Sequence, residues 1–228
     1  MRILEKATGA SLHAAAPTLQ NGFVSYRGIR IGVCGEVARV GEEIIGIRSV
    51  GSLAIRIPHD GAEELRRAAE SMFSPGAAST LIVGAPGAGK TSLLREMIRC
   101  AASRALCVSV IDERNELSAS FGGSAQFDLG ATCDVMVGAA KEKAAMMMLR
   151  GMNPQIIAMD EISQKEDIRA IEQIAGCGVT RFATAHGEGR EEMMKRPLYR
   201  ELLQAGYFLQ MLTIRCKSGQ RVYDREFL

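Results

Sequence analysis

The strongest chemical signal in the sequence is the segment from Gly84 to Thr91, which matches the pattern G-x-x-x-x-G-K-[ST]. Glycines let such a segment curl so that its backbone N–H groups point inward at a phosphate, and a following helix adds the positive end of its dipole. Lys90 can then reach the β- and γ-phosphates of ATP, and the Thr91 hydroxyl can bind Mg²⁺. The alternative is a glycine-rich turn that binds nothing. The expected nucleotide contacts are Gly84, Ala85, Pro86, Gly87, Ala88, Gly89, Lys90, Thr91 and Ser92.

Two adjacent carboxylates form the second signal: Asp160 and Glu161 follow the apolar run Ile156–Met159. Such a run predicts a buried strand, and open α/β sheets bind ligands outside the carboxyl ends of their strands. We expect Asp160 to hold Mg²⁺, directly or through a water, and Glu161 to orient or deprotonate the water that attacks ATP. The alternative is a strand end with two solvated acids. The phosphate-binding pattern upstream favours the catalytic interpretation.

Two weaker groups of polar residues also follow apolar runs. The segment Val110–Leu117 places acids at a strand end, where Glu113 could assist the water or Mg²⁺ and Arg114 could touch a phosphate. His186, in the segment Thr184–Gly187, could sense the γ-phosphate through a hydrogen bond. The alternatives are a solvated charged loop in the first case and a structural histidine in the second.

Alternating strands and helices must position these groups. Strands that alternate with helices predict a mainly parallel sheet covered on both faces, so the fold class is α/β. The expected strands are Thr80–Val83, Leu106–Ile111, Ile156–Met159 and Val179–Ala183, with a closing hairpin of Phe208–Cys216 and Arg221–Tyr223. The expected helices are Lys90–Ala102, Lys141–Arg150, Glu166–Ala175, Glu188–Lys195 and Leu198–Leu203.

A small α+β N-terminal module, residues 1–74, is expected to precede the larger domain, residues 75–228. Short β-rich runs broken by glycine favour two hairpins, and Asp60 opens an amphipathic helix. The expected elements are Gly22–Tyr26 with Ile29–Cys34, Ile44–Arg48 with Leu53–Ile57, and the helix Ala62–Met72. The segment Ser74-Pro75-Gly76 is the expected linker.

The composition bears on compartment and partners. The formal net charge of this chain of 228 residues is +2, so charge gives no reason to expect nucleic-acid binding. None of the six cysteines stands in a C-x-x-C pair, which favours buried thiols in a reducing compartment over a zinc site or a disulfide framework. No apolar run could span a bilayer, and Met1–Leu12 lacks the apolar core of a secretory signal. We expect a cytoplasmic protein that meets a membrane only through partners.

In their order, the motifs resemble those of the secretion ATPase superfamily, the motors of type II and type IV secretion and of pili. There a phosphate loop precedes an acidic Asp box, a Walker B strand and a His box, which correspond here to Gly84–Thr91, Asp112–Glu116, Ile156–Glu161 and Thr184–Gly187. The resemblance implies a RecA-like P-loop NTPase core and favours the γ-phosphate role of the histidine. The expected catalytic residues are Lys90, Glu113, Glu161 and His186.

A closer resemblance is to the stage III sporulation protein AA family of endospore-forming bacteria. It rests on the stretches Val110–Leu117, Met146–Ile162, Phe182–Gly187, Leu4–Ala10, Asn21–Cys34 and Ser52–Ile57. This resemblance implies an ATPase on the mother-cell side of the channel to the forespore, with membrane-embedded channel proteins as partners. The N-terminal part is shorter than in that family, so we expect a truncated start.

Similarity to the superfamily implies a homo-hexameric ring with ATP between subunits. Arginines of the N-terminal module or of a neighbouring subunit would complete the site, and Arg48, Arg56 and Arg114 are the candidates. The chain departs from the pilus-type motors in carrying Asp160-Glu161 where they carry Gly-Glu, and Ser163-Gln164 where Arg-Asp follows.

Two alternatives to the secretion motor stay open. A RecA-like nucleic-acid motor would share the core, but the near-neutral charge and the absence of Trp disfavour it. A nucleotide-binding scaffold with little turnover is disfavoured by Glu161. A DNA-stimulated turnover assay and the dependence of turnover on protein concentration would separate these alternatives from the motor.

Overall fold

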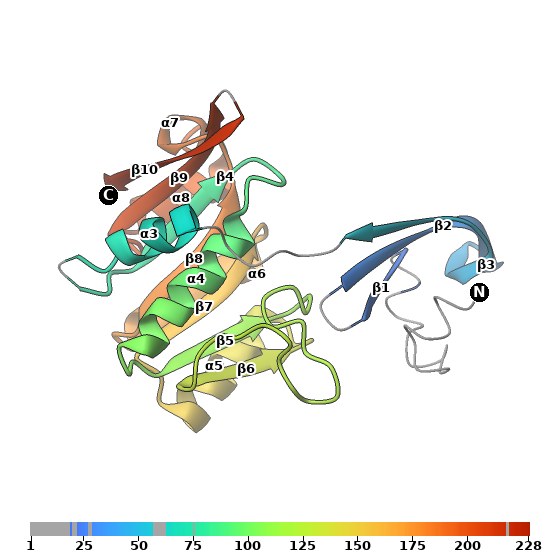
Figure 1. Ribbon diagram of the computed structural model, residues 1–228, viewed down its shortest axis with the longest axis horizontal. Helices are drawn as coiled ribbons and strands as arrows, with labels where there is room; N and C mark the ends of the chain where they lie inside the picture. The colour runs from blue at the N-terminus through green and yellow to red at the C-terminus, as the bar shows by residue number, and fades with distance from the viewer. Residues whose placement is uncertain (1–18, 20–21, 27–28, 57–62, 75, 218) are drawn as a thin grey trace. The chain divides into compact units, whose positions relative to one another are not determined.

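The computed structural model describes residues 19, 22–26, 29–56, 63–74, 76–217 and 219–228 (Figure 1). The chain divides into two compact units. The first comprises Met1–His59 and Ser118–Phe127, and the second comprises Asp60–Leu117 and Asp128–Leu228. All residues of the phosphate-binding pattern and of the acidic strand ends therefore belong to the second unit.

The first unit contains a three-stranded antiparallel sheet in the order β1-β2-β3. Its strands are β1 (Phe23–Tyr26), β2 (Ile29–Val40) and β3 (Glu43–Arg56). The expected second hairpin is wrong, because one long strand, β3, pairs with β2 over its whole length. The pairing register slips where Cys34 lies opposite Ser52 and Gly35 opposite Val50, so Gly51 marks a β-bulge rather than a turn. Ile57 and Asp60 lie outside the described residues.

The second unit is built on a seven-stranded sheet in the order β10-β9-β4-β8-β7-β5-β6. All neighbours run parallel except β9 and β10, which form the expected closing hairpin. The strands are β4 (Thr80–Gly84), β5 (Val108–Asp112), β6 (Cys133–Val137), β7 (Ile156–Ile162), β8 (Thr180–His186), β9 (Gln210–Lys217) and β10 (Gln220–Phe227). The expected mainly parallel α/β sheet is therefore confirmed, and β6 is an edge strand that the sequence analysis missed.

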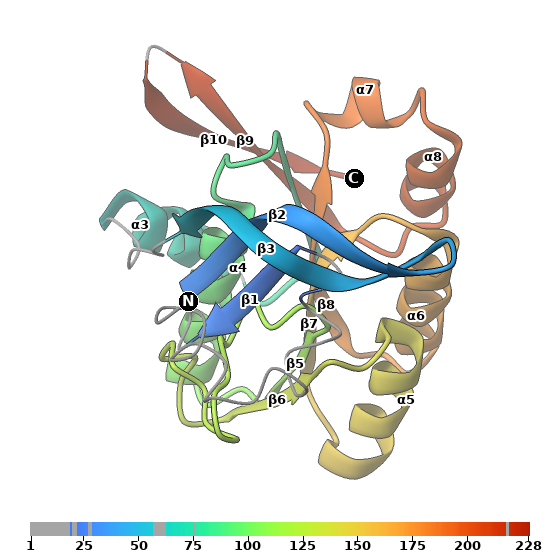
Figure 2. The ribbon, with the colours of Figure 1, turned by 90° about the vertical axis from the view of Figure 1, so that its right-hand side faces the viewer.

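Helices cover both faces of this sheet, and Figure 2 shows α4 on one side with α5 and α6 on the other. Two separate apolar clusters fill the two interfaces, as expected for a doubly covered parallel sheet. The helices are α3 (Glu63–Ser71), α4 (Lys90–Ser103), α5 (Lys141–Met152), α6 (Lys165–Gly176), α7 (Arg190–Met193) and α8 (Pro197–Gln204). Within the described ranges, no helix is long and apolar enough to cross a membrane.

Helix α3 belongs to the second unit, which differs from the expected boundary at residue 74. Leu65 and Ala69 of this helix, and Met72 directly after it, are buried in the same apolar cluster as residues of α4. The Gln210 amide nitrogen donates to the Met72 carbonyl over 3.3 Å and so joins the residue after the helix to β9. The amphipathic face of α3 was therefore read correctly, but from sequence its packing partner was assigned to the wrong unit.

Candidate functional site

The parallel register brings four strand ends to one edge of the second unit's sheet. Gly84, at the end of β4, lies opposite His186 of β8, while β5 ends at Asp112 and β7 carries Asp160 and Glu161. Every residue of β4 and β5 is buried, so a ligand at this edge can contact the loops that follow these strands but not the strands themselves. This is the edge at which open α/β sheets bind ligands.

The phosphate-binding pattern forms a tight turn between β4 and α4. Gly87 and Gly89 have φ values of 75° and 100°, a region that favours glycine because it has no Cβ. Helix α4 begins at Lys90, and the Leu93 amide donates to the Gly89 carbonyl over 2.9 Å. The amides of the first helical turn therefore face the same edge as the carboxylates, an arrangement suited to an anion.

Lys90 is 7% exposed, and its ammonium lies inside this turn. The Nζ atom donates to the carbonyls of Gly84 and Ala85 over 2.9 Å each and lies 3.0 Å from His186 Nδ1. Burial lowers the pKa of Lys90 from its ordinary value, and the charges of Asp160 and Glu161 oppose that shift. The ammonium thus contacts the loop itself, next to the histidine that the sequence analysis singled out.

Asp160 is held from two sides. The Thr91 hydroxyl donates to Asp160 Oδ2 over 2.8 Å, and the Thr184 hydroxyl donates to Oδ1. The Glu161 amide lies 3.1 Å from Oδ1 and 2.8 Å from the Thr184 hydroxyl. A hydroxyl of the phosphate-binding pattern and a carboxylate of β7 therefore point at one place.

The hydroxyl of Thr91 and the carboxylate of Asp160 are both ligand types that Mg²⁺ accepts. No cluster of three or more His, Cys, Asp or Glu side chains that could hold a metal occurs among the residues that the structure describes. Protein-bound Mg²⁺ usually takes only one or two carboxylates and completes its shell with phosphates and waters. The pair therefore fits a magnesium ion that arrives with a nucleotide better than a permanent metal centre.

Glu161 adopts an uncommon backbone conformation, with φ at 51°. The pairing between β7 and β8 slips between Met159 and Ile162, so the strand bulges where Glu161 leaves it. Its carboxylate forms an ion pair with Arg114, and Oε1 lies 3.6 Å from His186 Nε2. One histidine therefore lies between the ammonium of the phosphate-binding turn and the carboxylate of β7.

We expect the free energy of unfolding of Glu161→Gly to exceed that of Glu161→Ala by about 1 kcal/mol. A positive φ costs free energy in alanine, which has a Cβ, but not in glycine. Both variants lose the ion pair with Arg114, so the comparison isolates the backbone. Urea denaturation of both variants measures the difference. Equal stabilities would show that the backbone at Glu161 relaxes to an ordinary conformation.

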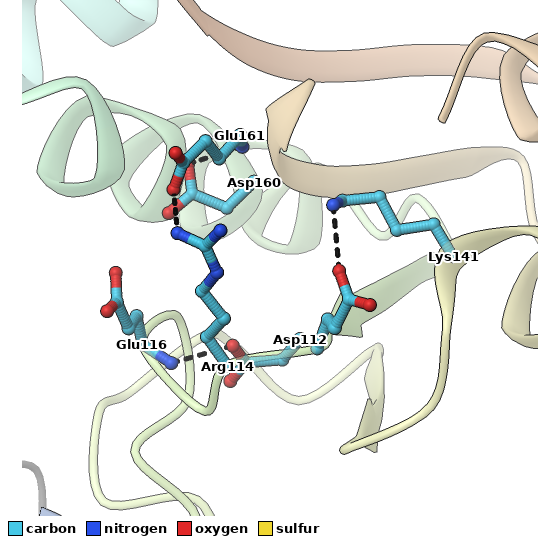
Figure 3. Close-up of a pocket in the computed structure, with 7 residues that line it drawn as sticks. Asp112, Arg114, Glu116, Lys141, Asp160 and Glu161 are labelled. Carbon is cyan, nitrogen blue, oxygen red and sulfur yellow. Dashed lines mark hydrogen bonds and ion pairs between the residues drawn. The ribbon is translucent and has the colours of Figure 1, made fainter. Parts of the chain in front are cut away.

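The loop after β5 lies over this edge (Figure 3). Asp112 is 1% exposed, and its Oδ1 accepts the amides of Glu116 and Leu117 over 2.7 and 3.0 Å. The side chain of Arg114 reaches Glu161, whereas Glu113 Oε2 lies 2.9 Å from Lys141 Nζ. The loop is thus ordered by its own carboxylates.

The backbone of His186 is held by Arg196, which lies between α7 and α8. Arg196 donates to the His186 carbonyl, pairs with Glu192 over 2.9 Å and stacks on the Tyr199 ring at 4.3 Å. The Tyr199 hydroxyl donates to the Ile162 carbonyl over 3.0 Å. The ends of β7 and β8 are therefore both hydrogen-bonded to the stacked pair Arg196 and Tyr199.

A family model described as "Sporulation stage III, protein AA" matches residues 2–225. The chain belongs to this family. Stage III sporulation protein AA of Bacillus subtilis is 29% identical over 234 residues, which cover 98% of this chain and 76% of that protein. The resemblance found in the sequence is therefore confirmed.

The fold is also shared with solved secretion and pilus ATPases. The ATPase DotB of Yersinia pseudotuberculosis aligns with a TM-score of 0.56 and 15% identity, covering 100% of this chain and 66% of that one. The pilus retraction motor PilT with bound ADP aligns with a TM-score of 0.53 and 17% identity, covering 88% of this chain and 59% of that one. The chain thus spans less than two thirds of these two structures. At such identities the likeness shows the RecA-like fold alone.

Most of the residues that the sequence singled out meet at one edge in this family member. Lys90, Thr91, Asp160, Glu161 and His186 are joined by the contacts above. Glu113 lines a pocket together with Asp160 and Glu161, but its carboxylate pairs with Lys141.

The candidate arginines differ in what the structure shows of them. Arg114 contacts Glu161. Arg48 belongs to the first unit, where its guanidinium pairs with Glu36 over 3.1 Å between exposed side chains. The side chain of Arg56 lies outside the described residues. Phosphate contacts of all three arginines stay predictions.

Three residues that contribute to the site were not predicted from the sequence: Thr184, Arg196 and Lys141. Thr184 stands in the segment that carries the candidate histidine, and a hydroxyl two residues before it on the same face of a strand was an available signal. Lys141 reaches Glu113, 28 residues away, and Arg196 donates to the backbone carbonyl of His186, so no local pattern marks either of these two contacts.

Proposed function

We propose that this chain hydrolyses ATP as the motor subunit of a secretion-type complex in the channel between mother cell and forespore. One observation carries the proposal: Thr91 and Asp160 are hydrogen-bonded at the same edge where His186 links Lys90 to Glu161. Phosphate-binding amides, an ammonium, a hydroxyl–carboxylate pair and a second carboxylate are the groups that ATP hydrolysis requires.

The roles follow from the chemistry of each group. The phosphate-binding turn and Lys90 would hold the phosphates, and Thr91 with Asp160 would hold Mg²⁺, which neutralises charge on the phosphates when bound. Glu161 would accept a proton from the attacking water, and His186 would contact the γ-phosphate. Before it acts, the Glu161 carboxylate must leave its ion pair with Arg114, whose guanidinium is then available to a phosphate.

Assembly belongs to the same proposal. DotB is an ATPase of this fold, PilT is a pilus retraction motor that was solved with ADP, and VirB11 of Brucella suis is an ATPase of a type IV secretion system. We propose a homo-hexamer that docks on membrane-embedded channel proteins from the cytoplasmic side. An N-terminal module would move with each turnover, and arginines of that module or of a neighbouring subunit would reach the nucleotide.

The test measures phosphate release by the purified chain with ATP, with and without Mg²⁺, over a range of protein concentrations. We expect turnover that needs Mg²⁺ and rises more steeply than protein concentration, because the ring must assemble. Native mass measurement with a non-hydrolysable ATP analogue should then show a ring. Absence of ATP binding in calorimetry would overturn the proposal, and binding with no turnover in assembled rings would favour a nucleotide-binding scaffold.

A further inference from the structure

Lys141 forms a buried ionic cluster next to the site. It is the first residue of α5, and its side chain is 6% exposed. Its Nζ lies 2.9 Å from Glu113 Oε2 and 3.1 Å from Asp167 Oδ1. A buried ammonium is stable only when it is paired, and two carboxylates here share one cation.

The two carboxylates differ in how firmly they are held. Asp167 is 2% exposed in its side chain, and its Oδ2 accepts the amides of Ser163 and Gln164 over 2.8 and 3.0 Å at the start of α6. Glu113 is 32% exposed and belongs to the loop after β5. Two helix starts therefore fix the position of the Lys141 ammonium, and the loop is the adjustable partner.

Fixing Glu113 also fixes its neighbour Arg114. Consecutive Cα atoms are about 3.8 Å apart, so the position of one loop residue restricts the next. Figure 3 shows Lys141 reaching the loop from a separate segment, while Arg114 extends from the loop toward Glu161. On the other side of Arg114 along the chain, the amides of Glu116 and Leu117 donate to the Asp112 carboxylate. The loop is thus held on both sides of the arginine.

We propose that Lys141 is a positioning residue: through Glu113 it holds the loop Asp112–Leu117 so that Arg114 meets Glu161. This inference rests on the proposed function for its effect on turnover, but not for its effect on the loop. It assigns the Glu113 carboxylate to Lys141 rather than to water or Mg²⁺.

The test compares the rates of amide hydrogen exchange in this loop between the unmodified chain and Lys141→Met, both without nucleotide. We expect exchange of residues 113–117 to quicken about tenfold or more, because their anchoring ion pair is gone. Lys143→Met is the matched control, since Lys143 is exposed on the same helix. Unchanged exchange in the loop of Lys141→Met would overturn the proposal.

Glu113→Leu keeps the test decisive if Lys141→Met fails to fold, because it leaves the Lys141–Asp167 pair intact. The same loop should loosen while the start of α6 keeps its protection. Loosening at α6 but not in the loop would contradict the assignment.

Turnover provides the second arm. Both single variants should lower kcat about tenfold with little change in KM for ATP, because a loosened loop no longer presents Arg114 to a phosphate once Glu161 has left their ion pair. Lys141→Met should add nothing in the Glu113→Leu background. If the fall in kcat of the double variant equals the product of the two single falls, Lys141 acts independently of Glu113, and the proposal is overturned. If the unmodified chain has no turnover, the proposed function fails, whereas the exchange measurement still decides the role of Lys141.

Discussion

Glu161→Gln should bind ATP as tightly as the unmodified chain and release almost no phosphate. The amide keeps the size of the side chain but cannot accept the proton of the attacking water, and general-base catalysis contributes about 10² to 10⁴-fold to such rates. Affinity should persist, because the phosphate-binding turn and Lys90 are untouched and one negative charge beside the phosphates is removed. Single-turnover phosphate release and titration with a fluorescent ATP analogue measure the two quantities.

Glu166→Gln is the matched control, because Glu166 is an exposed residue of α6 that carries the same change. Its turnover should equal that of the unmodified chain. Phosphate release by Glu161→Gln at the unmodified rate would remove Glu161 from the mechanism.

The sequence predicted the local structure around the candidate site well, because each strand and turn there is encoded in contiguous residues. A strand, a glycine-rich turn and a lysine that opens a helix occur within a dozen positions, so the phosphate-binding segment needs no distant information. The same holds for the apolar run that ends at Asp160. Parallel pairing places the carboxyl ends of these strands at one edge of the sheet. The sequence alone could therefore predict that the residues after these strands lie close together.

The errors arose where the answer depends on packing. Helix α3 has one apolar face whichever unit it joins, and only its contact with α4 assigns it to the second unit. Strand β6 is a partly exposed edge strand of mixed composition, so its period is weak. In β3, Gly51 resembles a turn residue in the sequence but accommodates a bulge.

The contacts of Glu113 illustrate the same limit within the site. In the sequence it stands beside Arg114 in an acidic loop, and its chemistry suits water or Mg²⁺. Its structural partner, Lys141, is 28 residues away, and the position of that ammonium depends on Asp167 at the start of another helix. Three segments must fold before this pairing exists, so no local pattern could reveal it.

Lys90→Ala should lose nucleotide affinity, with Kd for ATP rising about 10²-fold or more, equivalent to about 3 kcal/mol. The ammonium now contacts the Gly84 and Ala85 carbonyls and His186, all within the turn that would hold the phosphates. A triphosphate offers it a far stronger partner, because both the donor and the acceptor would be charged. Lys143→Ala, which truncates an exposed lysine of α5, should bind ATP normally.

The pH dependence of binding separates this role from a merely structural one. Burial lowers the pKa of Lys90, so this side chain loses its proton at a lower pH than an exposed lysine does. The positive charge that attracts the phosphates is lost with that proton. Affinity for ATP should therefore weaken as the pH rises toward that lowered pKa, and the weak binding by Lys90→Ala should lack this component. Calorimetric titrations of both proteins across the alkaline range make the comparison. Parallel pH profiles would show that the Lys90 charge does not hold the phosphates, and the proposed site would then lose its principal cation.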